Sequence, residues 1–162
     1  FDLRKSLNFV IWIETTGVFM RVIGHICRYH NEDPLKLNQG DIFVFGSNLG
    51  GRHGAGAAKT ALEQYGAVYR QGIGMQGNSY AIPTKTANLA ILPLSDIQKH
   101  VTDFVVFAKR SAHTDFYVTR IGCGYAGYSD ADIAPLFKRA IGETDLLNVI
   151  LPLPWRHFIE KQ

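Results

Sequence analysis

Short apolar runs alternate with amphipathic segments along this chain, and that alternation limits the fold more than any other feature of the sequence. Ile42–Phe45 is a continuous apolar run, which is typical of a strand buried on both faces. Apolar residues then recur at helical spacing over 57–65, over 96–111 and from Asp132 to Ile141. Strands that alternate with helices of about 10–16 residues predict an α/β fold whose largely parallel sheet is covered on both faces.

The helix ends and the other strands are predicted from shorter signals. Gly66 is expected to end the first helix, and Ser95 with Gln98 is typical of a capping box at the start of the second. Pro135 fits only the first turn of the third helix, so that helix is predicted to begin near Asp132. The polar segment 28–40 is interpreted as a loop. The remaining predicted strands are Val18–Cys27, Ser79–Pro83, Phe116–Thr119 and Asn148–Leu151.

Composition limits the class of protein. A chain of 162 residues, 46% hydrophobic and 19% charged, is typical of one soluble globular domain. A net charge of +3 with scattered basic residues suits an anionic ligand and is too weak to indicate nucleic acid. Cys27 and Cys123 are too few and too far apart for a disulfide framework, which favours a cytoplasmic location. His25, Cys27 and His30 lack a second ligand pair at zinc spacing, so neither a metal nor another cofactor is predicted.

The segment before the first methionine, Met20, has two interpretations. Residues 1–19 are a non-native extension, or Asn8–Ile13 adds an edge strand to the sheet. The apolar stretch there is too short for a signal peptide, and Glu14 and Arg21 interrupt any longer apolar window. We therefore expect no membrane span, and predict that residues 20–162 form a single domain.

Three glycine-rich segments adjoin the predicted strands, at 46–56, 72–78 and 121–129. The first and third fall at the carboxyl ends of strands, where open α/β sheets bind ligands. Glycine lets backbone N–H groups approach a ligand, and a helix N-terminus favours phosphate. Two such loops that face each other predict a cradle for an anionic, pyrophosphate-containing ligand; the alternative is that the glycines only serve tight turns. The spacing does not match a P-loop, and the G-x-G-x-x-G at 72–77 precedes a strand instead of following one.

Three motifs carry a family resemblance: SNLGGRHGAGAAK after the strand at 42–45, then SYAIPTK, then TRIGCGYAGYSDADIAPLF. Together they resemble the macrodomain superfamily, and most of all the branch of terminal ADP-ribose protein glycohydrolases and antitoxins that act on ADP-ribosylated DNA. The resemblance extends from about Gly40 to Leu151. It implies a three-layer α/β/α fold with a mixed, mostly parallel sheet, which binds ADP-ribose with the diphosphate between two glycine loops.

The resemblance also implies site residues. It places Asn48 near the distal ribose and makes Lys85 the nucleophile of a glycohydrolase, while Ala126 stands where that branch has an assisting Asp. Asp130 is the nearby carboxylate that could replace it, and Asp41 resembles an adenine-binding signature. The implied ligand-binding residues are Gly46, Ser47, Asn48, His53, Gly54, Ala55 and Gly56 from the first loop, with Gly122, Cys123, Gly124, Tyr125, Ala126 and Gly127 from the second.

Each candidate catalytic residue also has a structural interpretation. Lys85 is either a nucleophile with a lowered pKa or a surface lysine that follows a strand. His53 is either a base that contacts the ribose or a turn histidine packed beside glycines. Cys123 is expected to fill space under its loop and not to act as a reactive thiol.

These observations leave three functions, ranked in this order. The first is a binding module for free or attached ADP-ribose, or for a related NAD-derived nucleotide. The second is an ADP-ribosyl hydrolase that acts on modified protein or DNA through Lys85. The third is a nucleic-acid-binding protein, suggested by the basic pI of 8.9, whose binding would depend steeply on salt. Nucleic acid otherwise enters only as a modified substrate, and no membrane partner is expected.

Overall fold

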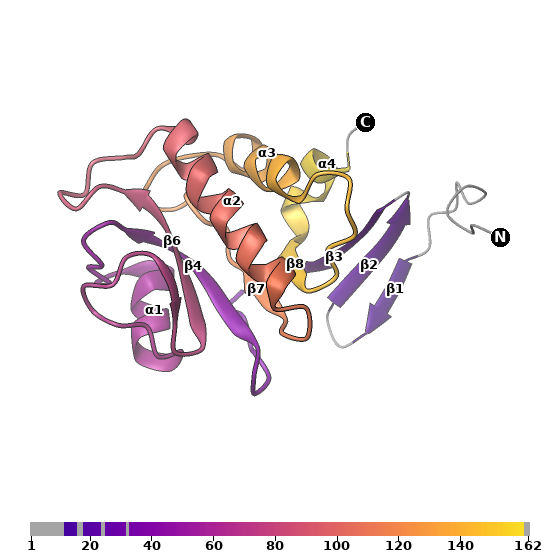
Figure 1. The fold of residues 1–162 in the computed structure, drawn as a ribbon, viewed down its shortest axis with the longest axis horizontal. Helices are drawn as coiled ribbons and strands as arrows, with labels where there is room; N and C mark the ends of the chain where they lie inside the picture. The colour runs from indigo at the N-terminus through magenta and orange to yellow at the C-terminus, as the bar shows by residue number, and fades with distance from the viewer. Residues whose placement is uncertain (1–11, 16–17, 24, 32, 161–162) are drawn as a thin grey trace.

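Figure 1 shows the computed structural model, which describes residues 12–15, 18–23, 25–31 and 33–160. Its strands are β1 (Trp12–Thr15), β2 (Val18–Ile23), β3 (His25–His30), β4 (Ile42–Asn48), β5 (Gly74–Gln76), β6 (Ser79–Lys85), β7 (Phe116–Val118) and β8 (Val149–Pro152). Its helices are α1 (Gly56–Gln64), α2 (Leu94–Arg110), α3 (Asp130–Ile141), the 3₁₀ turn η2 (Leu153–Trp155) and α4 (Arg156–Ile159).

The described strands form one sheet in the order β1-β2-β3-β8-β7-β4-β6-β5. The central pairings β3–β8, β8–β7, β7–β4 and β4–β6 are parallel, and the pairings at both edges are antiparallel. The prediction of a mixed, mostly parallel sheet is therefore confirmed.

Alternate residues of β4 face two separate apolar cores. Ile42 and Val44 lie in a core shared with α2, α3 and α4, whereas Phe43 and Phe45 lie in a second core with Ala61 of α1. Successive side chains of a strand point to opposite faces, so this continuous apolar run needs cover on both sides. Figure 1 shows that cover, with α1 on one face of the sheet and α2, α3 and α4 on the other. The α/β prediction with a covered sheet is confirmed.

The N-terminal part of the sheet differs from the sequence prediction. The single strand predicted over 18–27 is wrong, because β2 and β3 are two antiparallel strands. The loop predicted from residue 28 is also wrong at its start, because β3 continues to His30 beside β8. Polar residues fit this strand since Arg28 Nη1 donates to Asp115 Oδ1 at 2.9 Å and a ring nitrogen of His30 lies 2.7 Å from the Val118 carbonyl oxygen.

The helix starts are also corrected. The capping box predicted at Ser95 is wrong: α2 begins at Leu94, two residues before the predicted start at 96, and its N-cap is Pro93, which has no side-chain cap. The Pro93 carbonyl instead accepts hydrogen bonds from the backbone of Asp96 and Ile97. The third helix, α3, begins at 130 and not near 132, because Ser129 and Asp132 form the capping box there.

Two other sequence predictions concern the two edges of the sheet. The predicted edge strand Asn8–Ile13 lies mostly outside the described residues, although Trp12 and Ile13 belong to β1. The glycine-rich segment 72–78 contains the short edge strand β5.

Within the parts of the chain described above, no helix combines the length and apolar character needed to cross a membrane, and no cluster of His, Cys, Asp or Glu is arranged to hold a metal ion.

Candidate functional site

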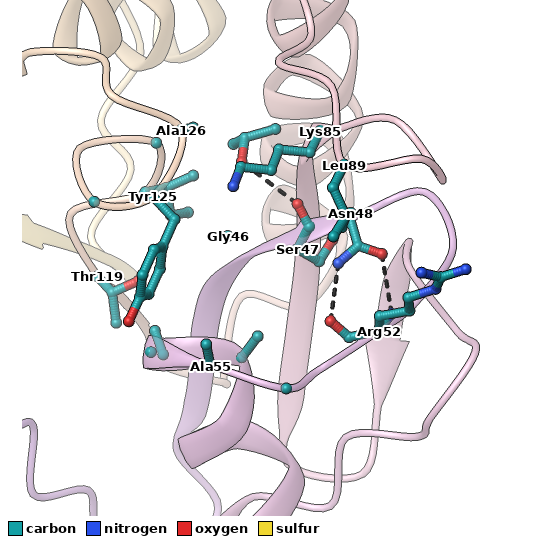
Figure 2. A pocket seen from close by; sticks show the side chains of 18 of the residues that line it. Gly46, Ser47, Asn48, Arg52, Ala55, Lys85, Leu89, Thr119, Tyr125 and Ala126 are labelled. Carbon is teal, nitrogen blue, oxygen red and sulfur yellow. Dashed lines mark hydrogen bonds between the residues drawn. The ribbon is translucent and has the colours of Figure 1, made fainter.

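A pocket of about 500 Å³ lies where the parallel strands β4, β6 and β7 end. The first turn of α1 lies along one side of the pocket and the segment 119–126 along the other (Figure 2). Ligands bind at this edge of open α/β sheets. The lining residues are Gly46, Ser47, Asn48, Arg52, Gly54, Ala55, Gly56, Ala57, Ala58, Thr84, Lys85, Leu89, Thr119, Arg120, Ile121, Gly122, Gly124, Tyr125 and Ala126.

The structure brings most of the predicted site residues together in this pocket. Those that line it are Gly46, Ser47, Asn48, Gly54, Ala55, Gly56, Lys85, Gly122, Gly124, Tyr125 and Ala126. His53, Cys123, Gly127 and Asp130 are not among its lining residues. Asp41 precedes β4, at the opposite end of that strand from the pocket.

His53 is held by the protein itself. Its side chain is almost completely buried and meets the Phe45 ring edge-on, with 5.2 Å between ring centroids. Nε2 lies 3.0 Å from the Gln71 carbonyl oxygen and 3.3 Å from Gln76 Oε1, which itself accepts the Val68 N–H. Both neighbours of Nε2 are acceptors, so Nε2 carries the hydrogen. These contacts favour the structural interpretation of His53.

Two glycines allow the backbones of neighbouring loops to come into contact beside the pocket. Gly51 has φ +64°, and a Cβ there would overlap the backbone of Arg70, whose N–H donates to the Gly51 carbonyl at 2.8 Å. A Cβ on Gly72 would likewise overlap the Asn48 carbonyl oxygen. Backbone approaches this close are open only to glycine. We call the segments 49–52, 69–72 and 86–88 the joined rim.

Asn48 closes the first loop onto itself. Its Oδ1 accepts the Arg52 N–H at 3.0 Å and its Nδ2 donates to the Arg52 carbonyl at 2.9 Å (Figure 2). An amide side chain has two donor hydrogens and two acceptor lone pairs, so one of each remains available to a ligand. The side chain predicted to contact a ribose therefore also sets the position of Arg52.

The N-terminus of α1 faces the pocket without a capping group. The helix begins at Gly56, its N-cap residue Ala55 provides no side-chain hydrogen bond, and its first turn has no acidic residue. The first N–H groups of a helix lack partners within the helix and form a positive dipole end. An anion in the pocket would supply the missing acceptor.

The loop that follows β7 is tightly turned around its glycines. Gly122 and Gly127 have φ of +75° and +77°, and the Gly122 carbonyl accepts the Tyr128 N–H at 2.9 Å. This turn presents Tyr125 at the surface, with 74% of its side chain exposed. Lys85 Nζ lies 5.7 Å from the centroid of the Tyr125 ring and points across the pocket towards it (Figure 2).

Asp130 is held by three other side chains. Its carboxylate accepts two hydrogen bonds from Arg120, at 3.0 and 2.7 Å, and one from Trp155 Nε1 at 2.7 Å. Cys123 Sγ is a weaker donor at 3.5 Å. Partial burial raises the pKa of Asp130, but these hydrogen bonds outweigh burial and leave that pKa below its ordinary value. Asp130 thus positions Arg120, which lines the pocket.

Cys123 is partly buried and packs against the apolar core shared with α2, α3 and α4. Burial and the negative charge of Asp130 raise the pKa of its thiol to about 12. The group therefore stays protonated near neutral pH, whereas a nucleophilic cysteine requires a lowered pKa.

Sequence reasoning missed the two arginines of the pocket, Arg52 and Arg120, and the apolar Leu89 at its edge. Arg52 lies inside the first glycine loop and Arg120 immediately before the second, so position beside a glycine loop was the available signal. Leu89 gives no such signal. Its backbone has a φ of +66°, which leucine rarely adopts, in the loop after β6. Strained residues of this kind cluster at functional sites.

Together, the uncapped helix end, the turned glycine loop and the pocket cations define an α/β protein with a cation-lined pocket at the carboxyl edge of its sheet. Comparison with solved structures identifies the fold more closely. Over 72% of its length the chain superposes on Thermosipho africanus DarTG in complex with ADP-ribose, with a TM-score of 0.51 and 17% identity. It spans 39% of that protein's length.

A second solved structure, a protein from Bacteroides thetaiotaomicron, matches 76% of this chain and 97% of its own length, with a TM-score of 0.51 and 14% identity. No protein-family model matches the sequence, and no curated protein does. The chain has a macrodomain-like fold, as the three sequence motifs predicted.

Proposed function

We propose that the pocket binds ADP-ribose or a related NAD-derived nucleotide, with the diphosphate between the N-terminus of α1 and the loop 121–127. The charge of the lining carries this proposal. Lys85 and Arg120 line the pocket, Arg52 lies at its edge with its side chain pointing away from Lys85 and Tyr125 (Figure 2), and the described lining includes no Asp or Glu. A volume of about 500 Å³ lies within the usual range of small-molecule sites, about 300–1,000 Å³. The likeness to a structure in complex with ADP-ribose supports the same ligand.

A thermal-shift titration tests this function. At about 100 times its dissociation constant, ADP-ribose should stabilise the protein by about 2.7 kcal/mol, which for a chain of this size raises the melting temperature by about 5–10 °C. AMP and ribose 5-phosphate, which each lack one half of the ligand and the diphosphate, should give smaller shifts. Equal shifts for all three ligands, or no shift for ADP-ribose, would disprove the proposal.

One observation favours a second candidate function, the removal of ADP-ribose from modified protein or DNA. Lys85 Nζ lies inside the pocket beside an exposed aromatic ring, where a nucleophile would meet a ribose. Ala126 leaves no carboxylate at the position where the resembling branch has one, and Asp130 is held by Arg120 and Trp155. We therefore rank hydrolysis below binding.

Replacement of Lys85 separates the two functions. If the protein is a hydrolase, Lys85→Ala should abolish release of ADP-ribose from a modified peptide or oligonucleotide, followed by mass spectrometry, while binding of free ADP-ribose falls much less. Lys85→Arg, which retains the charge, serves as the control for electrostatic effects. Wild-type protein that releases nothing from ester-linked or base-linked substrates would rule out the hydrolase.

A further inference from the structure

The carboxylate of Asp130 joins two parts of the chain that lie far apart in sequence. Its Oδ2 accepts a hydrogen bond from Arg120 Nη2 at 2.7 Å, and its Oδ1 accepts one from Arg120 Nε at 3.0 Å. Oδ1 also accepts the indole N–H of Trp155 at 2.7 Å. Trp155 ends η2 and directly precedes α4, which lies beside α3 (Figure 1). One carboxylate therefore connects the C-terminal segment to an arginine that lines the pocket.

Trp155 is held in place by packing. Its side chain is completely buried, and its ring packs on Phe137 of α3 with 5.1 Å between ring centroids. The indole N–H is the only polar group of a tryptophan side chain, and a buried N–H without a partner costs free energy. The acceptor that this buried N–H meets is the Asp130 carboxylate. The position of the carboxylate is therefore set from the interior of the protein.

Helix capping does not account for the place of Asp130. It is the first residue of α3, but Ser129 and Asp132 already form the capping box of that helix. The two oxygens of Asp130 accept instead from the side chains described above, which belong to other segments of the chain. The role of this carboxylate thus lies in the connection between Arg120 and Trp155.

The contact with the indole changes what the Arg120–Asp130 pair can do. The Arg120 side chain is 56% exposed, and an ion pair at such a site is usually weak because ordering two side chains costs entropy. Trp155 removes part of that cost, since it orders Asp130 independently of Arg120. The paired contact with the carboxylate then fixes the plane of the guanidinium. The three guanidinium hydrogens that Asp130 does not accept are thereby oriented before a ligand binds.

We propose that Trp155 is a positioning residue of the pocket: its indole N–H holds the Asp130 carboxylate, which in turn holds Arg120 in the orientation that binds a diphosphate. The inference rests on the proposed function, because the diphosphate is the group that Arg120 contacts. Trp155 is not among the lining residues of the pocket, so its effect on a ligand is indirect. Loss of its N–H should therefore weaken binding only while Arg120 is present.

An NMR titration of the Asp130 carboxyl group tests the connection without any ligand. Partial burial raises the pKa of Asp130, and hydrogen bonds from Arg120, Trp155 and Cys123 bring it below its ordinary value. Trp155→Phe removes a donor that stabilises the charged carboxylate, so the pKa of Asp130 should rise. A pKa that stays at its wild-type value in Trp155→Phe would overturn the inference.

Phe137→Leu is the matched control for packing. It alters the contact beside the ring of Trp155 but removes no hydrogen bond, so it should leave the pKa of Asp130 unchanged. The other carboxylates that act on Arg120 or Cys123, those of Asp33 and Asp132, are the same in both variants. An equal rise of that pKa in the two variants would make Trp155 a packing residue only and contradict the proposal.

A surface variant keeps the inference testable if Trp155→Phe does not fold. Arg120→Ala removes two of the donors to Asp130, so the indole N–H resonance of Trp155 should shift in that variant, again without ligand. Arg110→Ala, at the far end of α2, should leave the resonance unmoved. A resonance that is the same in wild type and in Arg120→Ala would mean that the arginine and the indole are not connected, and would overturn the inference.

Calorimetric titration with ADP-ribose measures the effect on binding. Trp155→Phe should weaken binding by about three- to tenfold, less than Arg120→Ala, because Arg120 retains its charge and its two bonds to Asp130. In the double variant Trp155→Phe should add no further loss, because the two residues act as one unit. Losses that multiply in the double variant would contradict the proposal. Wild-type protein that binds no ADP-ribose would disprove the proposed function, whereas the two ligand-free measurements test by themselves whether Trp155 holds Arg120.

Discussion

Gly51→Ala should destabilise the fold by about 3 kcal/mol, which combines roughly 1–2 kcal/mol of left-handed backbone strain with about 1–3 kcal/mol of steric overlap. Gly51 has φ +64°, and a Cβ there would overlap the backbone of Arg70 and Gln71, which cannot move away as a flexible side chain could. For a chain of this length the melting temperature should fall by about 6–12 °C, as measured by calorimetry or circular dichroism.

Gly54→Ala is the matched control, three residues along the same loop. A Cβ at Gly54 meets no atom within 4 Å, and its φ is not in the left-handed range. Surface substitutions of this kind usually change stability by less than about 0.5 kcal/mol. If Gly51→Ala were no more destabilising than Gly54→Ala, the joined rim would not have the tight backbone contacts described here.

Arg120→Ala should weaken ADP-ribose binding by about 10–100-fold, because a charge-assisted hydrogen bond is worth about 1.5–3 kcal/mol and each 1.4 kcal/mol is tenfold. Asp130 takes two of the five guanidinium donors of Arg120, which leaves three for a ligand. Arg120→Lys retains the charge but not the paired geometry, so its loss should be intermediate. Isothermal titration calorimetry gives the affinities, and Arg110→Ala serves as the distant control.

The contribution of the Arg120–Asp130 pair to the stability of the fold should be lost in acid. The pKa of Asp130 in the folded protein lies below the value of 3.8 in the unfolded chain, so its contribution to stability is complete above about pH 4 and is lost as pH falls further. ADP-ribose binding should accordingly show no step from this pair between pH 5 and 8.

If Arg120→Ala left the affinity for ADP-ribose unchanged, the diphosphate would have to bind away from the loop 121–127.

The parallel centre of the fold was predictable because its signals are local. The apolar run at Ile42–Phe45 and the helical stripes need only neighbouring residues to be recognised. The extent of β3 was not predictable in this way, because the partners of the polar Arg28 are distant in sequence: Asp115, 87 residues away, and the Leu147 carbonyl, 119 residues away. The capping box expected at Ser95 fails for a local reason, since α2 already begins at Leu94 and the carbonyl of Pro93 accepts the N–H groups of Asp96 and Ile97.

The candidate site was predictable where glycine is required by the local backbone, as at Gly56 and Gly122, both with positive φ. The positions of the side chains in the site were harder to predict. Arg120 reaches the pocket in a fixed position because Asp130 holds it, and no sequence pattern joins these two residues. His53 and Asp130 were singled out by residue type, yet each is occupied by contacts with other parts of the chain.

The joined rim has a consequence for how this edge of the molecule fluctuates. Leu49 donates to the Lys85 carbonyl, Gly51 to Asn48, and Arg70 to Gly51. A segment linked to its neighbours in this way cannot open alone, so the three loops behave as a single cooperative unit of local unfolding. A ligand in the pocket then meets loops whose backbone entropy was lost during folding, and little further ordering of the backbone opposes its binding.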